Sequence, residues 1–226
     1  MDGKQRELLS QISSDRILFS CEGVAESVIV ELLVKNDLLV FNKDRIITDL
    51  DNDDACYTLA RKASKIPQSM LTRQEKEEGA EEDITVLCVQ DQPHHLPLQF
   101  RSPFNEWVQS LNITTNPEIE MLVVYAENRL QEYESWKRRR RGNAGAKLKP
   151  SLYCKEVLAL EDARFKHIKN RNILEEYWGN SDRLLYAIDQ FRQHCPTKGR
   201  ADFMLADLVD PKAPIQAEPG WLEGGR

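Results

Sequence analysis

RILFSCEGVAE, at residues 16–26, is the stretch that decides how this chain folds. Ile17–Cys21 has the character of a buried strand, and the apolar spacing that follows predicts a helix over Val24–Lys35. Gly23 permits the tight turn between them, because glycine adopts backbone angles barred to other residues. Glu22 is therefore expected at the carboxyl end of a strand, where ligands gather in open α/β sheets. The same position also suits a solvated loop residue or a helix-start carboxylate.

Strands and helices alternate along the first 136 residues. ITVLCV, Ile84–Val89, is the most strand-like segment of the chain, and Leu38–Phe41 is predicted to be a short buried strand. Helices are predicted over Ala55–Ser64 and Phe104–Leu111. Such alternation is typical of an α/β fold, with a mostly parallel sheet flanked by helices.

The C-terminal third is predicted to be α-helical. Glu118–Tyr125 is a buried element, either a strand or a strand that runs into a helix. The helices expected after it are Arg129–Lys137, Leu152–Leu160, Ile173–Trp178, and one capped by Ser181 or Asp182 that ends near His194. The predicted organisation is an α/β domain over residues 16–136, a basic flexible segment over 137–149, a helical extension packed on the sheet over 150–210, and a poorly ordered tail over 211–226.

The composition is that of an ordinary globular protein. Of the 226 residues, 41% are hydrophobic and 30% are charged, and the net charge of -6 argues against a general nucleic-acid coat. No apolar run is long enough to span a membrane, and MDGKQRELLSQ lacks the apolar core of a signal peptide, so a cytoplasmic location is expected. The five cysteines are scattered, which predicts buried reduced thiols. His94 and His95 have no partner at zinc spacing.

Acidic residues stand where several apolar elements begin or end. They are Glu22, Asp49, Asp51, Asp91, Glu118 and Glu120. Carboxylates at neighbouring strand ends can converge on one Mg²⁺, which would polarise a phosphate and activate a water, while a further carboxylate acts as general acid or base. Two alternatives stay open: residues 49–54 also suit a turn or a helix cap, and Glu118 and Glu120 also suit solvent-facing or ion-paired positions.

CEGVAESVIVELL, followed by ITVLCVQDQ and then by PEIEMLVVYAE, is similar to the Toprim domain over about residues 16–136. It most resembles the small stand-alone Toprim proteins and the overcoming-lysogenization-type nucleases of bacteria and their phages. The resemblance implies a Toprim-like fold, Mg²⁺-dependent nuclease or phosphoryl-transfer activity, a setting of phage–host conflict, and Glu22 as general acid/base. The metal ligands that it suggests are Asp91, Glu120, Asp49 and Asp51. Gln92, or Pro93 at the next place, stands where the family has the second aspartate of a pair.

A basic segment, KRRRRGNAGAKLK, occupies Lys137–Lys149. Positive charge beside an acidic metal site would suit the phosphate backbone of DNA or RNA, and Trp136 and Tyr153 are placed to stack on bases. The segment is also compatible with a solvated loop, and the two aromatic residues with a helix core. The candidate nucleic-acid contacts are Arg138, Arg139, Arg140, Arg141, Lys147, Lys149 and Lys155.

The sequence thus supports two main hypotheses. One is a Mg²⁺-dependent nuclease or related phosphoryl-transfer enzyme. The other is a non-catalytic binding or regulatory protein that acts through a protein partner, with a decayed metal site marked by Gln92. A simple nucleic-acid-binding module is a third. No G-x-x-x-x-G-K-[ST] motif occurs, so any use of ATP would require a separate ATPase subunit.

Overall fold

The structure, a computed structural model, separates into two compact units. It describes residues 1–13, 15–49, 55–72, 82–91, 98–116, 118–140, 148–194 and 203–211. The first unit, called the sheet unit below, contains the described residues up to 116 together with 203–211, and the second, the helical unit, contains those from 118 to 194. The chain therefore divides near residue 117 rather than after residue 136 as predicted. The expectation that the helical part packs on the sheet stays a prediction.

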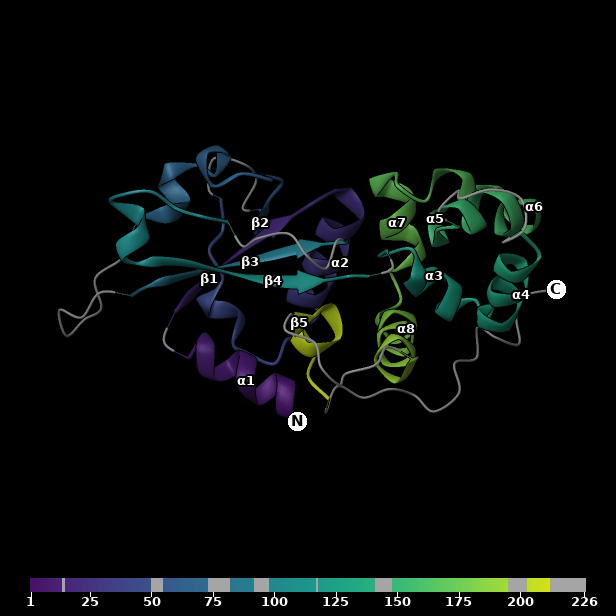
Figure 1. The fold of residues 1–226 in the computed structure, drawn as a ribbon, viewed down its shortest axis with the longest axis horizontal. Coiled ribbons are helices and arrows are strands. Elements are labelled where there is room, and N and C mark those ends of the chain that lie inside the picture. The colour runs from purple at the N-terminus through teal and green to yellow at the C-terminus, as the bar shows by residue number, and fades with distance from the viewer. Residues whose placement is uncertain are drawn as a thin grey trace. The chain divides into compact units, whose positions relative to one another are not determined.

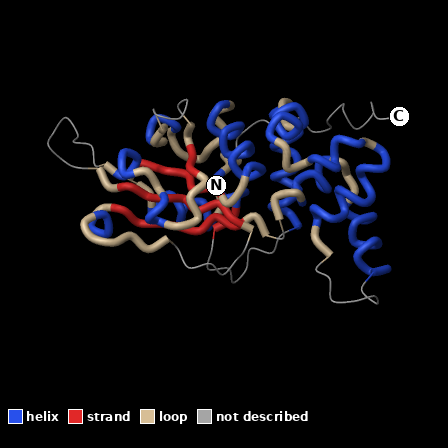
Figure 2. The backbone as a smooth tube through the Cα atoms, turned by 90° about the horizontal axis from the view of Figure 1, so that it is seen from above, coloured by secondary structure: helices blue, strands red, loops and turns tan. Residues whose placement is uncertain are grey.

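The sheet unit is built on a five-stranded, all-parallel sheet, which confirms the predicted α/β class. The strand order is β2-β1-β3-β4-β5, and Figure 2 shows the strands as one layer. The helices and strands of this unit, labelled in Figure 1, are α1 (Gly3–Gln11), β1 (Arg16–Cys21), α2 (Val24–Lys35), β2 (Tyr57–Thr58), β3 (Ile84–Gln90), β4 (Val108–Thr114) and β5 (Phe203–Met204).

The order of the strands creates a switch point between β1 and β3. β2 lies on one side of β1, whereas β3 and the later strands lie on the other. In a doubly wound sheet of this order, the crevice beyond the carboxyl ends of β1 and β3 is the usual place for a ligand. Cys21 pairs with Val89 in the register of the two strands, so both strands end at the same level.

The central strands β1 and β3 are buried on both faces, as expected for parallel strands. On one face Leu18, Val86 and Cys88 belong to a buried cluster with residues of the segment 47–71, against which Phe100 and Phe104 pack partly buried. At the amino end of the other face, Thr85 donates to the carboxylate of Asp15, which also accepts a hydrogen bond from Gln109 at 2.9 Å. β1 and β3 therefore lie in the core, as their apolar sequences predict.

Three of the predicted local structures are wrong. Leu38–Phe41 is buried but contributes only a single bridge, between Leu39 and Val209. Ala55–Ser64 is not a helix, because it contains the edge strand β2 and leads into a 3-10 turn. Phe104–Leu111 begins with a 3-10 turn and then enters β4. In each case pairing with a distant strand or segment outweighs the local helical or strand pattern.

The helical unit contains no strand among its described residues. Its helices are α3 (Met121–Ala126), α4 (Leu130–Arg140), α5 (Pro150–Tyr153), α6 (Ala159–Glu161), α7 (Arg171–Tyr177) and α8 (Ser181–His194). A π-helical turn over Cys154–Leu158 joins α5 to α6. The predicted helical character of this region is confirmed. The strand predicted at the start of Glu118–Tyr125 is wrong, because a turn there leads directly into α3. Asn180 caps α8, rather than Ser181 or Asp182, because its side chain accepts the first free N–H groups of the helix.

Four cysteines are buried free thiols, as predicted: Cys21, Cys56, Cys88 and Cys154. Cys195, the histidine pair, most of the charge-rich stretch 72–83 and the tail from residue 212 lie outside the described residues. The part of the chain that the structure describes has no helix of the length and hydrophobicity needed to cross a bilayer.

Candidate active site at the carboxyl ends of β1 and β3

Glu22 is the first residue after β1, and it lies beside Asp91 at the end of β3. The N–H of Glu22 donates to the carbonyl of Val89 at 2.9 Å, which extends the pairing of the two strands by one residue. The carboxylate oxygen Oε2 of Glu22 accepts the N–H of Asp91 at 3.1 Å. The two acidic residues that the sequence places at neighbouring strand ends are therefore brought together at the switch point.

Arg61 holds the backbone at Glu22 and faces its carboxylate. The Nε and Nη2 groups of Arg61 donate to the main-chain carbonyl of Glu22 at 3.1 and 2.9 Å. Nη2 also lies 3.8 Å from Oε1 of Glu22, while the arginine side chain is 69% exposed. A largely exposed guanidinium beside a carboxylate is suited to bind the phosphate of a ligand. Sequence reasoning misses Arg61, because this residue lies within the helix wrongly predicted over Ala55–Ser64.

A pocket of about 280 Å³ opens at this point of the sheet unit. Its described lining comes from the ends of β1 and β3 together with residues 60–61 and Leu98, and its polar members include Glu22, Arg61 and Gln90. The volume is slightly below the range of about 300–1,000 Å³ found for drug-sized ligands. The pocket therefore suits one phosphate group and its surroundings better than a whole organic molecule.

The thiols that line the pocket are not suited to nucleophilic chemistry. Burial raises the pKa of Cys88 to about 11, even though a backbone hydrogen bond near Leu98 lowers it. Burial, followed by the charge of Glu26, holds the pKa of Cys21 well above its ordinary value. Because the thiolate is the reactive form of cysteine, neither residue is activated for attack.

Asp91 offers a carboxylate of the kind that Mg²⁺ uses when a substrate supplies most of the remaining ligands, and Glu22 lies beside it. Mg²⁺ prefers hard oxygen atoms and is commonly held by one or two carboxylates, substrate phosphates and water. No group of three or more His, Cys, Asp or Glu side chains suited to a metal occurs within the described residues. The N–H of Asp49 donates to the carbonyl of Ala55 at 2.8 Å, in an isolated antiparallel bridge. Asp51 and Gln92 lie outside the described residues.

Glu118 and Glu120 belong to the helical unit, where each is ion-paired. Glu118 lies 2.5 Å from Lys149 and also accepts the N–H of Ser151 at 3.2 Å. Glu120 lies 3.1 Å from Lys169, and its side chain is 4% exposed. The contacts therefore favour the ion-paired alternative for both Glu118 and Glu120. They give no support to Glu120 as a metal ligand.

Several residues of the predicted nucleic-acid interface have structural partners in the helical unit. Arg140 pairs with Glu156 and lies over the ring of Trp136, and Lys149 pairs with Glu118. Trp136 and Tyr153 are buried, so they form a core and not a stacking platform. Arg138, Arg139 and Lys155 are exposed, whereas Arg141 and Lys147 lie outside the described residues.

Comparisons with protein-family models, with curated proteins and with solved structures found no significant match to this chain. The geometry of the site is therefore the main guide to its function.

Proposed function

We propose that the chain is a Mg²⁺-dependent phosphoryl-transfer enzyme of the Toprim type that cleaves nucleic acid at the carboxyl ends of β1 and β3. The observation that carries the proposal is the hydrogen bond of 3.1 Å from the Asp91 N–H to the Glu22 carboxylate, at the switch point of the sheet. The carboxylate of Glu22 lies in a small pocket that also contains the Arg61 cation, and it accepts a hydrogen bond from the backbone of the proposed metal-binding residue, Asp91.

Each residue has a distinct role in this proposal. Asp91 would hold the metal, and bound Mg²⁺ would polarise the phosphodiester and help to ionise the attacking water or hydroxyl. Glu22 takes the proton from that nucleophile as general base, or returns it to the leaving oxygen as general acid. Arg61 binds a non-bridging phosphate oxygen through the guanidinium edge that its backbone contacts leave exposed. The exposed Arg138, Arg139 and Lys155 of the helical unit are candidate contacts to the nucleic-acid backbone.

The test is cleavage of plasmid DNA and of RNA by the purified protein and by Glu22→Gln. Glutamine keeps the size of the side chain and an oxygen that can accept the Asp91 N–H, but it cannot carry a proton. Loss of general acid/base catalysis reduces rates by about 10²–10⁴-fold. We expect magnesium-dependent cleavage that falls by this factor in Glu22→Gln. Equal cleavage by both proteins would remove Glu22 from the mechanism.

A binding protein without catalysis is the second candidate, and Gln92 favours it because a neutral amide is a poorer Mg²⁺ ligand than a carboxylate. Such a protein would act through a protein partner, and a separate ATPase subunit is one form that the partner could take. A magnesium titration of the thermal midpoint separates the two, since a resident metal raises the midpoint by mass action. The buried free thiols suit the reducing cytoplasm, where we place either activity.

A further inference from the structure

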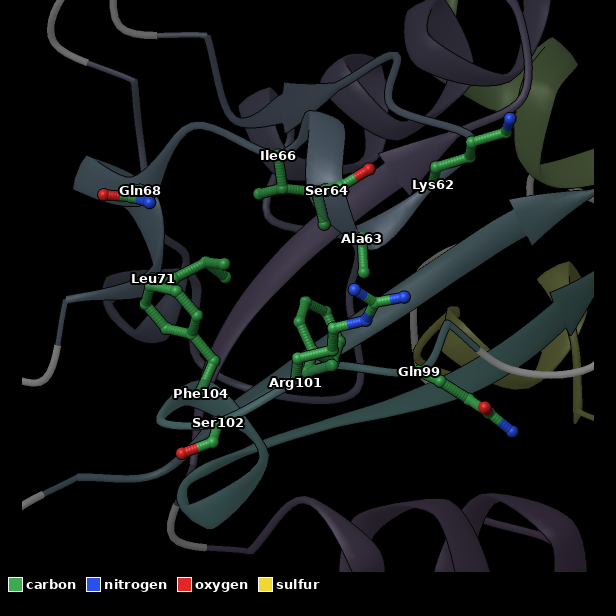
Figure 3. A pocket seen from close by; sticks show the side chains of 11 residues that line it. Lys62, Ala63, Ser64, Ile66, Gln68, Leu71, Gln99, Arg101, Ser102 and Phe104 are labelled. Atoms are coloured by element: carbon green, nitrogen blue, oxygen red, sulfur yellow. The ribbon is translucent and has the colours of Figure 1, made fainter.

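A second and larger pocket lies in the sheet unit and shares no lining residue with the first. Its volume is about 480 Å³, within the range of small-molecule sites. Residues from two chain segments, 62–71 and 99–104, line this pocket. Each segment directly follows a residue that lines the first pocket, Arg61 or Leu98. Figure 3 shows side chains from both segments turned toward this space.

The described lining of this pocket carries positive charge. Lys62 and Arg101 are both exposed, and none of the described residues that line the pocket is acidic. Neither cation is paired with a carboxylate of the described residues. Figure 3 shows the guanidinium of Arg101 reaching toward Ala63 in the middle of the pocket, while the ammonium of Lys62 extends away along the rim. The flexible lysine stem allows it to turn toward an anion that Arg101 holds.

The floor of the pocket is apolar and firmly supported. Leu71 and Phe104 lie close together at one end, and Phe100 also lines the pocket. Phe100 and Phe104 pack against the buried cluster without being fully buried, so part of each ring stays accessible. Trp107 fixes this end, because its ring packs edge-on to Phe104 at 5.7 Å and its Nε1 donates to the carbonyl of Leu71 at 3.0 Å. A flat ring can lie against such a floor.

Neutral hydrogen-bonding groups complete the lining. The amides of Gln68 and Gln99 stand at opposite ends in Figure 3, and Ser64 and Ser102 add hydroxyl groups to the lining. None of these four side chains makes a hydrogen bond through its own polar atoms within the described part of the chain. An amide presents both a donor and an acceptor, which is the combination that the edge of a heterocyclic base requires.

We propose that this pocket binds a nucleotide, with the phosphate at Arg101 and Lys62 and the base on the phenylalanine floor. Nucleotides combine an anion, a flat ring and a polar ring edge, and the pocket offers a complement to each. The nucleotide is either a free mononucleotide or one unit of a single-stranded nucleic acid, since both present the same chemistry. The inference rests on the lining alone, so it stands whether or not the first pocket is catalytic.

The proposal is tested by calorimetric titration of the full chain carrying Glu22→Gln. Magnesium is omitted, so that the probes are not cleaved during the measurement. The probes are the four nucleoside monophosphates, adenosine as a control without phosphate, and a short single-stranded oligothymidylate. Arg101→Gln should weaken binding at least about tenfold, the effect of losing roughly 1.4 kcal/mol of interaction. Lys65→Gln, a matched control that removes an exposed cation outside the lining, should leave binding unchanged.

If a mononucleotide binds and Arg101→Gln abolishes this binding, the ligand is a free nucleotide. If only the oligothymidylate binds and Arg101→Gln abolishes this binding, the ligand is a single-stranded nucleic acid. Three results would overturn the proposal: binding of no probe, equal binding of adenosine and its monophosphate, or equal weakening by Arg101→Gln and Lys65→Gln. Far-ultraviolet circular dichroism of each variant ensures that a loss of binding is not a loss of fold. Failure of the proposed nuclease activity would leave all these outcomes unaffected.

Discussion

Replacing Lys149 by methionine would remove the cation that neutralises a buried carboxylate in the helical unit. The Nζ atom of Lys149 lies 2.5 Å from Oε1 of Glu118, whose side chain is 6% exposed. The other oxygen of Glu118 accepts the N–H of Ser151 at 3.2 Å. Methionine keeps much of the apolar stem of lysine, so the change removes mainly the charge.

The size of the effect follows from how far each partner is exposed. Removing one member of a fully buried ion pair costs about 3–5 kcal/mol, whereas a pair on the surface contributes about 0.2–1 kcal/mol. Glu118 is buried, but the side chain of Lys149 is 44% exposed, and water screens its charge. We therefore expect Lys149→Met to lower the free energy of unfolding by about 1–3 kcal/mol at neutral pH.

The stability lost in Lys149→Met should disappear in acid. Burial alone would raise the pKa of Glu118, but the hydrogen bonds from Lys149 and Ser151 outweigh burial and hold it below its ordinary value of 4.5. A carboxyl group with a lowered folded pKa stabilises the protein above its unfolded pKa and loses that contribution as the pH falls through the folded value. The difference between wild type and Lys149→Met should therefore be complete above the ordinary pKa and shrink below it.

Urea denaturation followed by far-ultraviolet circular dichroism, at neutral pH and at several acidic values, measures this difference. Lys155→Met is the matched control, because Lys155 is exposed in the adjoining π-helical turn. Its effect should stay within about 0.5 kcal/mol. Equal stability of the two variants at neutral pH, or a difference that does not depend on pH, would show that Lys149 does not stabilise the Glu118 carboxylate.

Three further outcomes are expected. Leu87→Ala, at a fully buried position of β3, should cost about 2–5 kcal/mol in urea denaturation, and a loss below 1 kcal/mol would contradict the central place of β3. Native Cys88 and Cys154, with pKa values raised to about 11 and about 12 by burial, should not react with Ellman's reagent at mildly alkaline pH, but should react once guanidinium unfolds the chain. If the proposed activity is correct, Arg61→Gln should lower cleavage about 10²-fold with little change in the thermal midpoint, and an unchanged rate would exclude phosphate binding by Arg61.

The centre of the sheet could be predicted from the sequence because its signals are local. Ile17–Cys21 and Ile84–Val89 are buried along their whole length, and α2 begins and ends at the residues that the apolar spacing predicts. A buried parallel strand has an almost continuous apolar sequence, which few other local structures share.

The outer strands β2, β4 and β5 could not be predicted, because distant partners determine them. β4 contains Ser110 and Asn112, which satisfy their polar side chains by hydrogen bonds to Leu98 and Gln90 across the face of the sheet. β2 and β5 have two residues each, too few to carry a strand pattern. β5 also follows the helical unit in the chain, so nothing local indicates its return to the sheet.

The same distinction applies to the site residues. Glu22 and Asp91 could be paired in advance, because the carboxyl ends of neighbouring parallel strands meet at one edge. Glu120 could not be assigned, because Lys169, which neutralises it, is far away in sequence. Arg61 reaches Glu22 only because the segment after β2 turns back over the end of β1.

The contact between Glu22 and Asp91 depends finally on the register of β1 and β3. The first six residues of β3 are buried on both faces, so apolar burial alone distinguishes one register from another only weakly. A slip of two residues would keep the same face inward and move Asp91 by about 6.6 Å relative to Glu22. The hydrogen bond between Thr85 and Asp15, at the opposite end of β3, opposes such a slip because it would leave a buried carboxylate without this partner. The polar pair at the amino end of the strand thus helps to fix the position of the candidate site at its carboxyl end.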